Sequence, residues 1–503
     1  NKRARYSRPC DGCSLKKVKC SGTSPCTRCI NNGIPCTNNR IRKKCGPKPN
    51  KFKSTNNSNS NSSSRQSSTS SQFSKKPKTN LYSQPQLCSS CDKEMRISLS
   101  LIVPSLQIYQ TWFYGVWPVI SVPQLISNLT SVDFGFELSQ ETSVSYALCL
   151  AVSAAVSRQM TFLSEKSSLP QVPVNIDFES VAKEAIRIRD LYDHRLNPNC
   201  ETLLTSFFLY VYYINIKDAT ATAIIYLREA ISMAQILKLH DAKTYMRKPV
   251  AEAHRLKKIF YLLLITERFM CIEDNVPVIL DACVPYPSLE EEEYPELLSG
   301  FIELVHIFSI PNRDFFEKML EFNDDGGSGN SSDNYKMLHS FLHDASHSMS
   351  ESQIIEVDSK LRNISLTHLA SDIQKANILL SKSWMRSLTW HIAQKRGVLK
   401  RNFNDNDSCL SFNYPATIAN DFLKSICGIP IYAFESNGPG VVVKLLEIAS
   451  GLADSIQDLS SIKSSDDLQP CYNALSSIFS LICKFKTDTI LPVKLYQNIE
   501  RMV

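Results

Sequence analysis

Six cysteines near the start of the chain have the residue type and the spacing for metal chemistry. They follow the pattern C-x2-C-x6-C-x5-C-x2-C-x6-C, in which one C-x2-C-x6-C unit occurs twice. A further eleven cysteines are scattered over the rest of the chain, so the cluster favours a metal site over a disulfide framework. The six residues are Cys10, Cys13, Cys20, Cys26, Cys29 and Cys36.

The number of thiols limits how a metal ion would be held. Zn²⁺ prefers four tetrahedral ligands, so six thiolates serve one ion with two left over, or two ions if two thiolates bridge. The duplication favours two Zn²⁺ ions, with Cys10 and Cys26, the first cysteine of each half, as the bridges. Because the 27 residues of the cluster hold almost no apolar core, metal binding would supply the free energy of folding.

Basic residues lie between and beside these thiols. Lys16, Lys17 and Lys19 belong to the first half, where we expect a short helix to present them together. Lysine donates hydrogen bonds to the O6 and N7 atoms of guanine in the major groove, while neighbouring cations hold phosphates. The second half carries one cation, Arg28, for which we predict a contact with the DNA backbone.

The charge distribution separates the start of the chain from the rest. Residues 1–80 carry nineteen Lys and Arg against the single acid Asp11, a formal charge of +18, while the whole chain is +7 and the remainder therefore −11. Such a basic arm suits a nucleic acid, whose affinity comes largely from counterion release. Residues 54–80 hold eleven Ser and five Asn, too few apolar groups to offset ordering entropy. We therefore predict a basic cluster domain at 1–53, a flexible linker at 54–80 and a regulatory domain at 81–503.

Apolar residues recur at helical spacing from about residue 81 onward, which predicts a mostly α-helical domain. Helices are expected over 203–239, with a break near Lys217 and Asp218, and over 255–271, the latter largely buried. Surface loops are expected at 285–295 and 324–333. Two apolar ladders predict further helices: Leu380, Trp384, Leu388 and Ile392, and Leu445, Ile448, Leu452, Ile456 and Leu459.

Two classes of protein are disfavoured by what the sequence lacks. The most apolar short run, residues 259–265, is far below the roughly 20 residues of a membrane helix, and no apolar stretch of signal-peptide length follows the first basic residues. We expect an intracellular protein without a membrane partner. No G-x-S-x-G, P-loop, dinucleotide-binding or H-E-x-x-H pattern is present, which argues against an enzyme.

The cluster resembles the DNA-binding domain of the fungal binuclear zinc-cluster transcription regulators. The resemblance rests on the six-cysteine spacing, the lysines after the second cysteine and Pro25 just before the fourth. It implies double-stranded DNA as the partner and the nucleus as the location, and it assigns contacts with a CGG-type triplet to Lys16 and Lys17. Ser14 stands where such proteins often have a basic residue, so we expect one phosphate contact to be missing.

The rest of the chain is similar to the yeast regulators of maltose and sucrose utilisation. The shared landmarks are residues 43–48, 109–118, 260–269, 308–311, 438–440 and 446–449. This resemblance implies that the helical domain is a regulatory region of the middle homology type. It also implies that the targets are α-glucosidase and sugar-permease genes.

Further basic residues after the cluster predict phosphate contacts or nuclear import, with a merely solvated charge run as the alternative. The predicted phosphate contacts are Arg40, Arg42, Lys43 and Lys44, beside Lys48, and the import candidates are Arg42, Lys43, Lys44, Lys75, Lys76 and Lys78. Three other patterns favour ordinary structure. Cys88 and Cys91 are interpreted as free thiols, the triplet His339, His343 and His347 as a helix face, and residues 290–293 as a solvated loop rather than an activation segment.

The sequence thus predicts a nuclear, sequence-specific activator of maltose and sucrose utilisation genes that recruits transcription machinery or coactivators. A regulator of another pathway, or a repressor, is the alternative, because zinc-cluster modules bind short and similar triplets. Binding of a sugar or a chaperone by the helical domain stays open. So does homodimer formation, because residues 81–123 contain four prolines and no sustained heptad.

Overall fold

The computed structural model describes residues 9–23, 25–37, 96–130, 138–164, 177–292, 294–317, 349–366, 370–400, 408–460 and 464–485. The chain divides into two units, Asn1–Ser90 and Cys91–Val503, and each is described by itself. Within the described ranges, no helix combines the length and the apolar character needed to cross a membrane.

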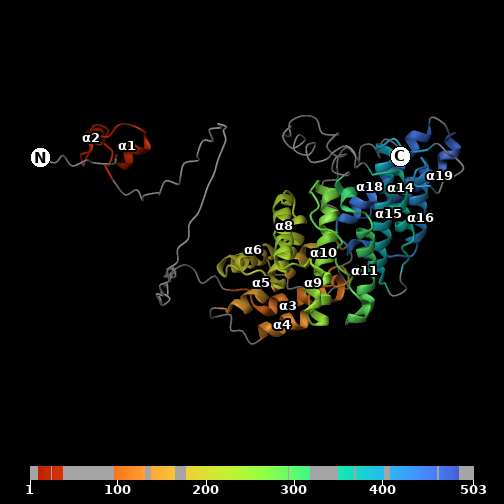
Figure 1. Ribbon diagram of the computed structural model, residues 1–503, viewed down its shortest axis with the longest axis horizontal. Coiled ribbons are helices and arrows are strands. Elements are labelled where there is room, and N and C mark those ends of the chain that lie inside the picture. Colours follow the sequence, from red (N-terminus) through yellow and green to blue (C-terminus); the bar gives the residue numbers. More distant parts are fainter. Residues whose placement is uncertain are drawn as a thin grey trace, which may run out of the picture. The chain divides into compact units, whose positions relative to one another are not determined.

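The first unit contains two short helices, and a cysteine begins each of them. Helix α1 spans Asp11–Leu15 after Cys10, and α2 spans Thr27–Asn31 after Cys26 (Figure 1). Helices of five residues are far too short to be stable in isolation. Packing around the thiols therefore has to hold both of them in place.

The second unit is built from helices, as the sequence predicts. Among its described residues the one β feature is an isolated bridge between Lys400 and Ser411. The longer helices are α3 Leu99–Ile108, α4 Val122–Thr130, α5 Gln140–Gln159, α6 Phe178–Leu191, α7 Cys200–Ile214, α8 Thr220–Ile236, α10 Val250–Asp274, α11 Pro295–Ser309, α14 Glu351–Arg362, α15 Asp372–Lys395, α16 Tyr414–Ser425, α18 Gly440–Ser460 and α19 Ser465–Ile482. Shorter elements are the π-helix η1 Tyr109–Phe113, the 3-10 helices η2 Met160–Phe162, η3 His194–Leu196 and η4 Leu289–Glu291, and the α-helices α9 Ala242–Met246 and α17 Ile431–Glu435.

Helices α10 and α11 lie between two groups of helices in this unit. Helices α5, α6, α7 and α8 pack against one another on one side, and α10 contacts α8 (Figure 1). On the other side α11 contacts both α10 and α15, and α15 packs on α18, which in turn packs on α19. The chain therefore places a continuous core along α7, α10, α15 and α18.

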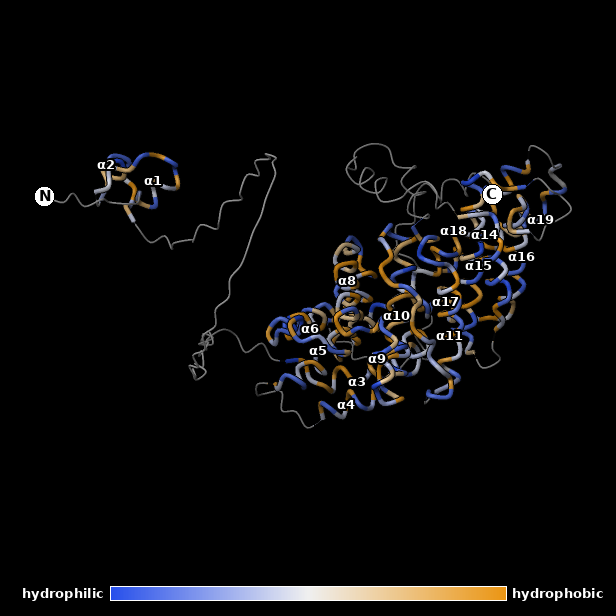
Figure 2. The backbone as a smooth tube through the Cα atoms, viewed as in Figure 1, coloured by the Kyte–Doolittle hydropathy of each residue, from blue (hydrophilic) through white to orange (hydrophobic). Residues whose placement is uncertain are grey.

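The predicted helices of the first group are confirmed. The segment 203–239 forms α7 and α8, and the break falls at Asp218, whose φ of 62° is left-handed. The segment 255–271 lies within α10, where every residue from Ile259 to Ile265 is buried. In Figure 2 both α8 and α10 carry hydrophobic and hydrophilic residues, as expected for helices that face a core on at least one side.

Both apolar ladders are confirmed as core. Leu380, Trp384, Leu388 and Ile392 on α15 are each at most 1% exposed. The five ladder residues of α18 are also buried, and α15 and α18 pack directly against each other. The ladder that contains Trp384 therefore serves packing, on the helix that the sequence predicts.

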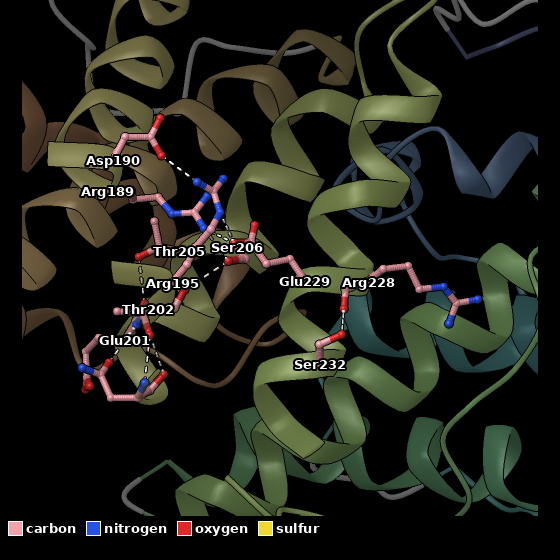
Figure 3. Close-up of polar contacts among 11 residues, drawn as sticks. Arg189, Asp190, Arg195, Glu201, Thr202, Thr205, Ser206, Arg228, Glu229 and Ser232 are labelled. Carbon is pink, nitrogen blue, oxygen red and sulfur yellow. Dashed lines mark hydrogen bonds and ion pairs between the residues drawn. The ribbon is translucent and has the colours of Figure 1, made fainter. Parts of the chain in front are cut away.

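A buried charge network joins α6, α7 and α8. Arg189 on α6 is 1% exposed and donates to Glu229 Oε1 on α8 at 2.8 Å and to Ser206 Oγ on α7 at 3.1 Å. Arg195 donates to the same Glu229 oxygen and to Asp190, each at 2.6 Å (Figure 3). Two carboxylates thus balance two guanidinium groups, and the network ties three helices together.

The acidic loop differs from the prediction at one residue. Glu290 and Glu291 are exposed, as expected of a solvated loop, but the side chain of Glu292 is only 3% exposed. Its carboxylate accepts hydrogen bonds from Lys258 Nζ at 2.6 Å, His254 Nε2 at 3.0 Å and the Tyr114 hydroxyl at 3.1 Å. Burial works against ionisation, but the partners, His254 and Lys258 first, outweigh it and lower the pKa of Glu292 to about 2. This glutamate is therefore a structural group.

Several predicted features lie outside the described residues. They are the linker 54–80, the loop 324–333, Glu293, Cys88 and Cys91, and His339, His343 and His347. Their assignments stay predictions from the sequence.

Candidate zinc centre and nucleic-acid interface

The six predicted cysteines come together in space. The Sγ atoms of Cys10 and Cys26 lie 3.6 Å apart, as do those of Cys10 and Cys29 and those of Cys13 and Cys26. A disulfide would place two sulfur atoms about 2.05 Å apart, and all six cysteines are free. Thiolates bound tetrahedrally to one zinc ion at about 2.3 Å lie about 3.8 Å from one another. The observed separations therefore suit sulfur atoms that share metal ions.

The sulfur atoms fall into two groups of four, and the atoms of each group lie within 4.8 Å of one another. Cys10 and Cys26 belong to both groups. Together the groups offer the eight ligand positions that two four-coordinate Zn²⁺ ions need, with only soft sulfur donors, which Zn²⁺ accepts readily. One group is Cys10, Cys13, Cys20 and Cys26, and the other is Cys10, Cys26, Cys29 and Cys36.

The two halves repeat the same backbone hydrogen bonds with an offset of sixteen residues. The Val18 N–H donates to the carbonyl of Cys13, and the Ile34 N–H donates to that of Cys29, both at 3.0 Å. Likewise Lys17 donates to Ser14 and Gly33 donates to Ile30, both at 3.2 Å. This pair of bonds closes a helix with a Schellman motif, which requires a left-handed residue after the last turn. Lys17 with φ 49° and Gly33 with φ 62° occupy that position.

Backbone groups support the thiolates and close the cluster. The Cys29 N–H donates to Cys26 Sγ at 3.4 Å, and this bond is the main reason that the pKa of Cys26 is lowered to about 6. The Cys26 N–H in turn donates to Cys36 Sγ at 3.3 Å. The end of the cluster is tied to its start, because the Asp11 N–H donates to the Thr37 carbonyl at 2.8 Å.

The predicted DNA-contacting lysines are exposed, but they do not all lie on a helix. We expected a helix between the second and third cysteines, whereas α1 runs from the first cysteine and ends at Leu15. Lys16 caps its end and Lys17 lies in the left-handed turn beyond it. The chain turns there because it must return to bring Cys20 to the sulfur cluster. Lys16, Lys17 and Lys19 are nevertheless all exposed on this half.

Cations of both halves meet at one shallow hollow. Lys19 from the first half and the exposed Arg28 of α2 line it. The Thr27 N–H donates to Ser21 Oγ at 3.1 Å, which holds the two walls together. The remaining lining residues are Cys20, Asn31 and Asn32. The hollow therefore combines two positive charges with several hydrogen-bonding groups, a set that suits a phosphate.

The other predicted contacts lie outside the described residues. These are Arg40, Arg42, Lys43, Lys44 and Lys48 for DNA, and Lys75, Lys76 and Lys78 for nuclear import. Sequence reasoning missed the left-handed role of Lys17 and the lining residues Ser21 and Thr27. The first had a signal, since an alignment of the halves at an offset of sixteen puts Lys17 opposite Gly33.

The chain matches two families of protein domains. Residues 8–45 match the Fungal Zn(2)-Cys(6) binuclear cluster domain, and residues 106–394 match the Fungal specific transcription factor domain. The first match includes all six cysteines, and the second covers more than half of the chain. Both matches confirm the predicted fold class and the two-zinc cofactor.

Known proteins are similar to the chain over nearly its whole length. It is 41% identical over 507 aligned positions to the "Probable sucrose utilization protein SUC1" of Candida albicans, covering 99% of this chain and 88% of that protein. It is 25% identical to the "Maltose fermentation regulatory protein MAL63" of Saccharomyces cerevisiae, covering 94% and 90%. The "Respiratory transcription factor ZNF1" of the same yeast is 23% identical, covering 95% and 91%.

These similarities decide the class of protein. The matched domains and relatives are those of transcription factors rather than enzymes, as the sequence predicts. The chain belongs to the fungal zinc-cluster transcription factors, DNA-binding proteins in which a Zn(2)-Cys(6) binuclear cluster that binds two zinc ions accompanies a fungal specific transcription factor domain.

Proposed function

We propose that the protein is a nuclear, sequence-specific activator of maltose and sucrose utilisation genes, such as those for α-glucosidase and sugar permease. The proposed pathway rests on the 41% identity, over 99% of the chain, to the probable sucrose utilization protein of Candida albicans. Similarity to a maltose fermentation regulatory protein over 94% of the chain also supports a role in disaccharide utilisation. In this proposal the helical body receives the carbon-source signal and recruits transcription machinery.

The six cysteines are the ligands of the two zinc ions in this proposal, and Cys10 and Cys26 bridge them. Support comes from the two sulfur groups, which have only these two residues in common. Cys13 and Cys20 then complete one tetrahedron, and Cys29 and Cys36 complete the other. Because so few apolar residues lie in this unit, the loaded cluster is also what keeps α1 and α2 folded.

Lys16 and Lys17 contact the base edges of a CGG-type triplet in this proposal. Both are exposed, and they are neighbours in the turn that ends α1. Lysine ammonium groups donate to guanine O6 and N7, which distinguishes guanine from the other bases in the major groove. Lys19 and Arg28, which line the hollow between the halves, hold a phosphate and set the register of the cluster on DNA.

A different pathway, or repression, is the second candidate. It is favoured by the similarity to a respiratory transcription factor, which covers 95% of the chain. The two candidates share the same zinc centre and DNA surface, so the identity of the regulated genes and the direction of their regulation separate them.

DNA binding by the full-length, zinc-loaded protein tests the interface. We expect tight binding to a duplex with a CGG triplet, weak binding to a duplex in which the triplet is changed, and loss of the preference in Cys26→Ala. The matched control is Cys427→Ala, which removes an exposed thiol of the helical body. CGG-specific binding by Cys26→Ala at the strength of the control would overturn the zinc assignment.

A further inference from the structure

The helical body contains a partly open cavity at the meeting point of its two groups of helices. Its volume is about 190 Å³, somewhat more than a cavity of about 150 Å³ that holds a benzene ring. Apolar and aromatic side chains from α7, α10 and α11 form most of the wall, among them Phe207, Phe269 and Phe308. The cavity is thus large enough for a compact organic molecule built on a single ring.

One wall carries a buried lysine. Lys444 of α18 is 8% exposed, and its Nζ donates to Ser381 Oγ at 2.8 Å and to Asn377 Oδ1 at 3.4 Å. The same Nζ lies 5.5 Å from the ring centroids of Phe269 and Trp384. Among the described residues, no carboxylate forms an ion pair with it. Two of its three N–H groups are used, and each goes to a neutral acceptor.

A buried ammonium without an anion is costly, because neutral acceptors and aromatic faces replace only part of its hydration. Burial accordingly lowers the pKa of Lys444 to about 7. Two other buried cations of the body each have a carboxylate beside them. Lys258 has Glu292 at 2.6 Å, and Arg189 has Glu229 at 2.8 Å. Lys444 has no such carboxylate among the described residues. Buried Arg268 also has none and donates to the carbonyl groups of Phe308 and Pro311, but Lys444 differs from it because Lys444 lines the cavity.

A second polar group in the cavity also has an unmet hydrogen bond. The amide oxygen of Asn215 is buried and accepts no hydrogen bond from any described residue, while its Nδ2 donates to the Val211 carbonyl at 2.8 Å. Asn215 lines the cavity with Lys444. The cavity therefore offers one cationic donor and one neutral acceptor, which call for an anionic oxygen and a hydroxyl on the same ligand.

Two glycines allow the wall of this cavity to pack tightly. The loop Gly438–Gly440 forms part of the wall, and Gly438 has a left-handed φ of 81°. A Cβ atom at Gly438 would lie 2.4 Å from Gln159 Nε2, and one at Gly440 would lie 2.9 Å from the Phe269 ring. Side chains at these positions would push Gln159 and Phe269 out of their places in the cavity wall.

We propose that this cavity binds a compact organic anion of about the size of a hexose, whose carboxylate or phosphate accepts from Lys444 Nζ and whose hydroxyl donates to Asn215 Oδ1. The inference concerns the helical body alone and does not depend on the DNA sequence or the genes that the protein regulates. A sugar acid and a sugar phosphate share the required chemistry, so both are probes in the test.

Isothermal titration calorimetry on the full-length, zinc-loaded protein tests the proposal. The probes are gluconate and glucose 6-phosphate, with glucose as the uncharged control. We expect at least one anion to bind, and the one that binds identifies carboxylate or phosphate as the charged group. Lys444→Met should weaken its binding roughly tenfold to a hundredfold, as expected when a hydrogen bond to a charged group is lost. The exposed Lys360→Met on α14 is the matched control and should bind normally.

The proton balance gives a second readout. Because the ligand holds Lys444 in its charged form, binding at pH 8 should take up close to one proton, seen as a heat that varies with the buffer's ionisation enthalpy. Lys444→Met should take up none. Binding of neither anion, binding of glucose alone, or equal anion binding by Lys444→Met would each overturn the proposal.

The unfolding temperature of the ligand-free protein is a third readout, and it does not require the Lys444→Met variant to bind any ligand. A lysine retained for a ligand costs stability in the free protein, so Lys444→Met should unfold at a higher temperature than the wild type. A lower unfolding temperature of Lys444→Met would show that the lysine serves the fold, and would contradict the ligand site.

Discussion

Lys17 and Gly33 occupy equivalent left-handed positions, sixteen residues apart, in the two halves of the zinc cluster. The same Schellman hydrogen bonds surround both residues, so the backbone makes the same demand at each. Glycine meets this demand without steric cost, whereas a side chain with a Cβ costs about 1 kcal/mol or more there. The first half therefore keeps a lysine at a position where the fold alone favours glycine.

This relationship predicts that Lys17→Gly has opposite effects on the stability of the cluster and on its DNA specificity. The substitution should stabilise the zinc-loaded cluster by about 1 kcal/mol, yet cost about 1 to 3 kcal/mol in discrimination at one base pair. Zinc retention against a chelator reports the first effect, and binding to duplexes that differ at single positions reports the second. Lys17→Ala is the control, since it removes the ammonium and keeps the left-handed strain. Unchanged specificity in both variants would show that Lys17 does not contact a base.

The phosphate contact predicts a different signature for Arg28→Ala. Loss of a cation that holds a phosphate should weaken binding to all sequences alike and reduce the slope of log affinity against log salt by about 1. The measurement is a salt titration on a CGG duplex and on a changed duplex. The exposed Lys360→Met on α14 should leave the slope unchanged. A selective loss on the CGG duplex would instead make Arg28 a base-contacting residue.

The buried ion pair of Glu292 predicts a large effect of a small change. Glu292→Gln removes the carboxylate that lies 2.6 Å from the Nζ of Lys258, a lysine that is 6% exposed, so we expect a loss of about 3 to 5 kcal/mol in the free energy of unfolding. Denaturant unfolding near neutral pH measures this loss. Glu291→Gln on the exposed part of the same loop should change stability by less than about 0.5 kcal/mol. If both variants unfolded alike, the loop would be solvated throughout.

The carboxylate of Glu292 also makes the stability of the protein depend on pH in the acid range. Its pKa is lowered to about 2 in the folded protein, from the ordinary glutamate value of 4.5, so its contribution is present above about pH 4.5 and is lost as the pH falls toward 2. The difference in stability between the wild type and Glu292→Gln should therefore shrink over that range. A difference that stayed constant down to pH 3 would contradict the assigned ion pair.

The ion pairs of His391 on α15 predict that stability also depends on pH in the alkaline range. Its Nδ1 lies 2.7 Å from Glu447 and its Nε2 lies 3.5 Å from Asp454, both on α18. Burial disfavours the imidazolium, but the two carboxylates outweigh burial and raise the pKa of His391 to about 9. A raised pKa means that the stabilisation is fully present below about pH 6.5 and is lost as the pH rises through about 9.

We therefore expect His391→Gln to lower stability by up to about 3 kcal/mol at pH 6, and hardly at all above pH 10. Thermal unfolding of both proteins across this range measures the effect. The exposed His240→Gln is the control and should show no such trend. A stability gap that widened with pH would contradict the protonated state of His391.

Local patterns predicted the helices and the sulfur cluster well. The spacing of the six cysteines was enough to predict that they form one cluster. The ladder of Leu380, Trp384, Leu388 and Ile392 likewise predicted a helix, and it marks a buried face of α15. Both depend on residues close in sequence, whose relative positions a helix or a metal ion determines. The predicted position of the first helix was wrong. We expected it between Cys13 and Cys20, but α1 spans Asp11–Leu15, because the chain must then return toward Cys20.

Long-range partners account for what the sequence did not reveal. In the run of acidic residues 290–293 nothing distinguishes Glu292, because its partner Lys258 lies 34 residues earlier. Lys444 and Asn215 meet at one cavity although more than two hundred residues separate them. Such pairings arise only when α7, α10 and α18 are packed, and no local periodicity encodes them.

The most direct test of the central claim is the level of α-glucosidase mRNA in host cells shifted to maltose or sucrose. The intact gene is compared with alleles that carry Cys26→Ala or the control Cys427→Ala at the chromosomal locus. A zinc-dependent activator of disaccharide utilisation predicts that Cys26→Ala abolishes the rise in mRNA and that Cys427→Ala preserves it. An undiminished rise in the Cys26→Ala strain, with the protein at its normal level, would contradict the claim.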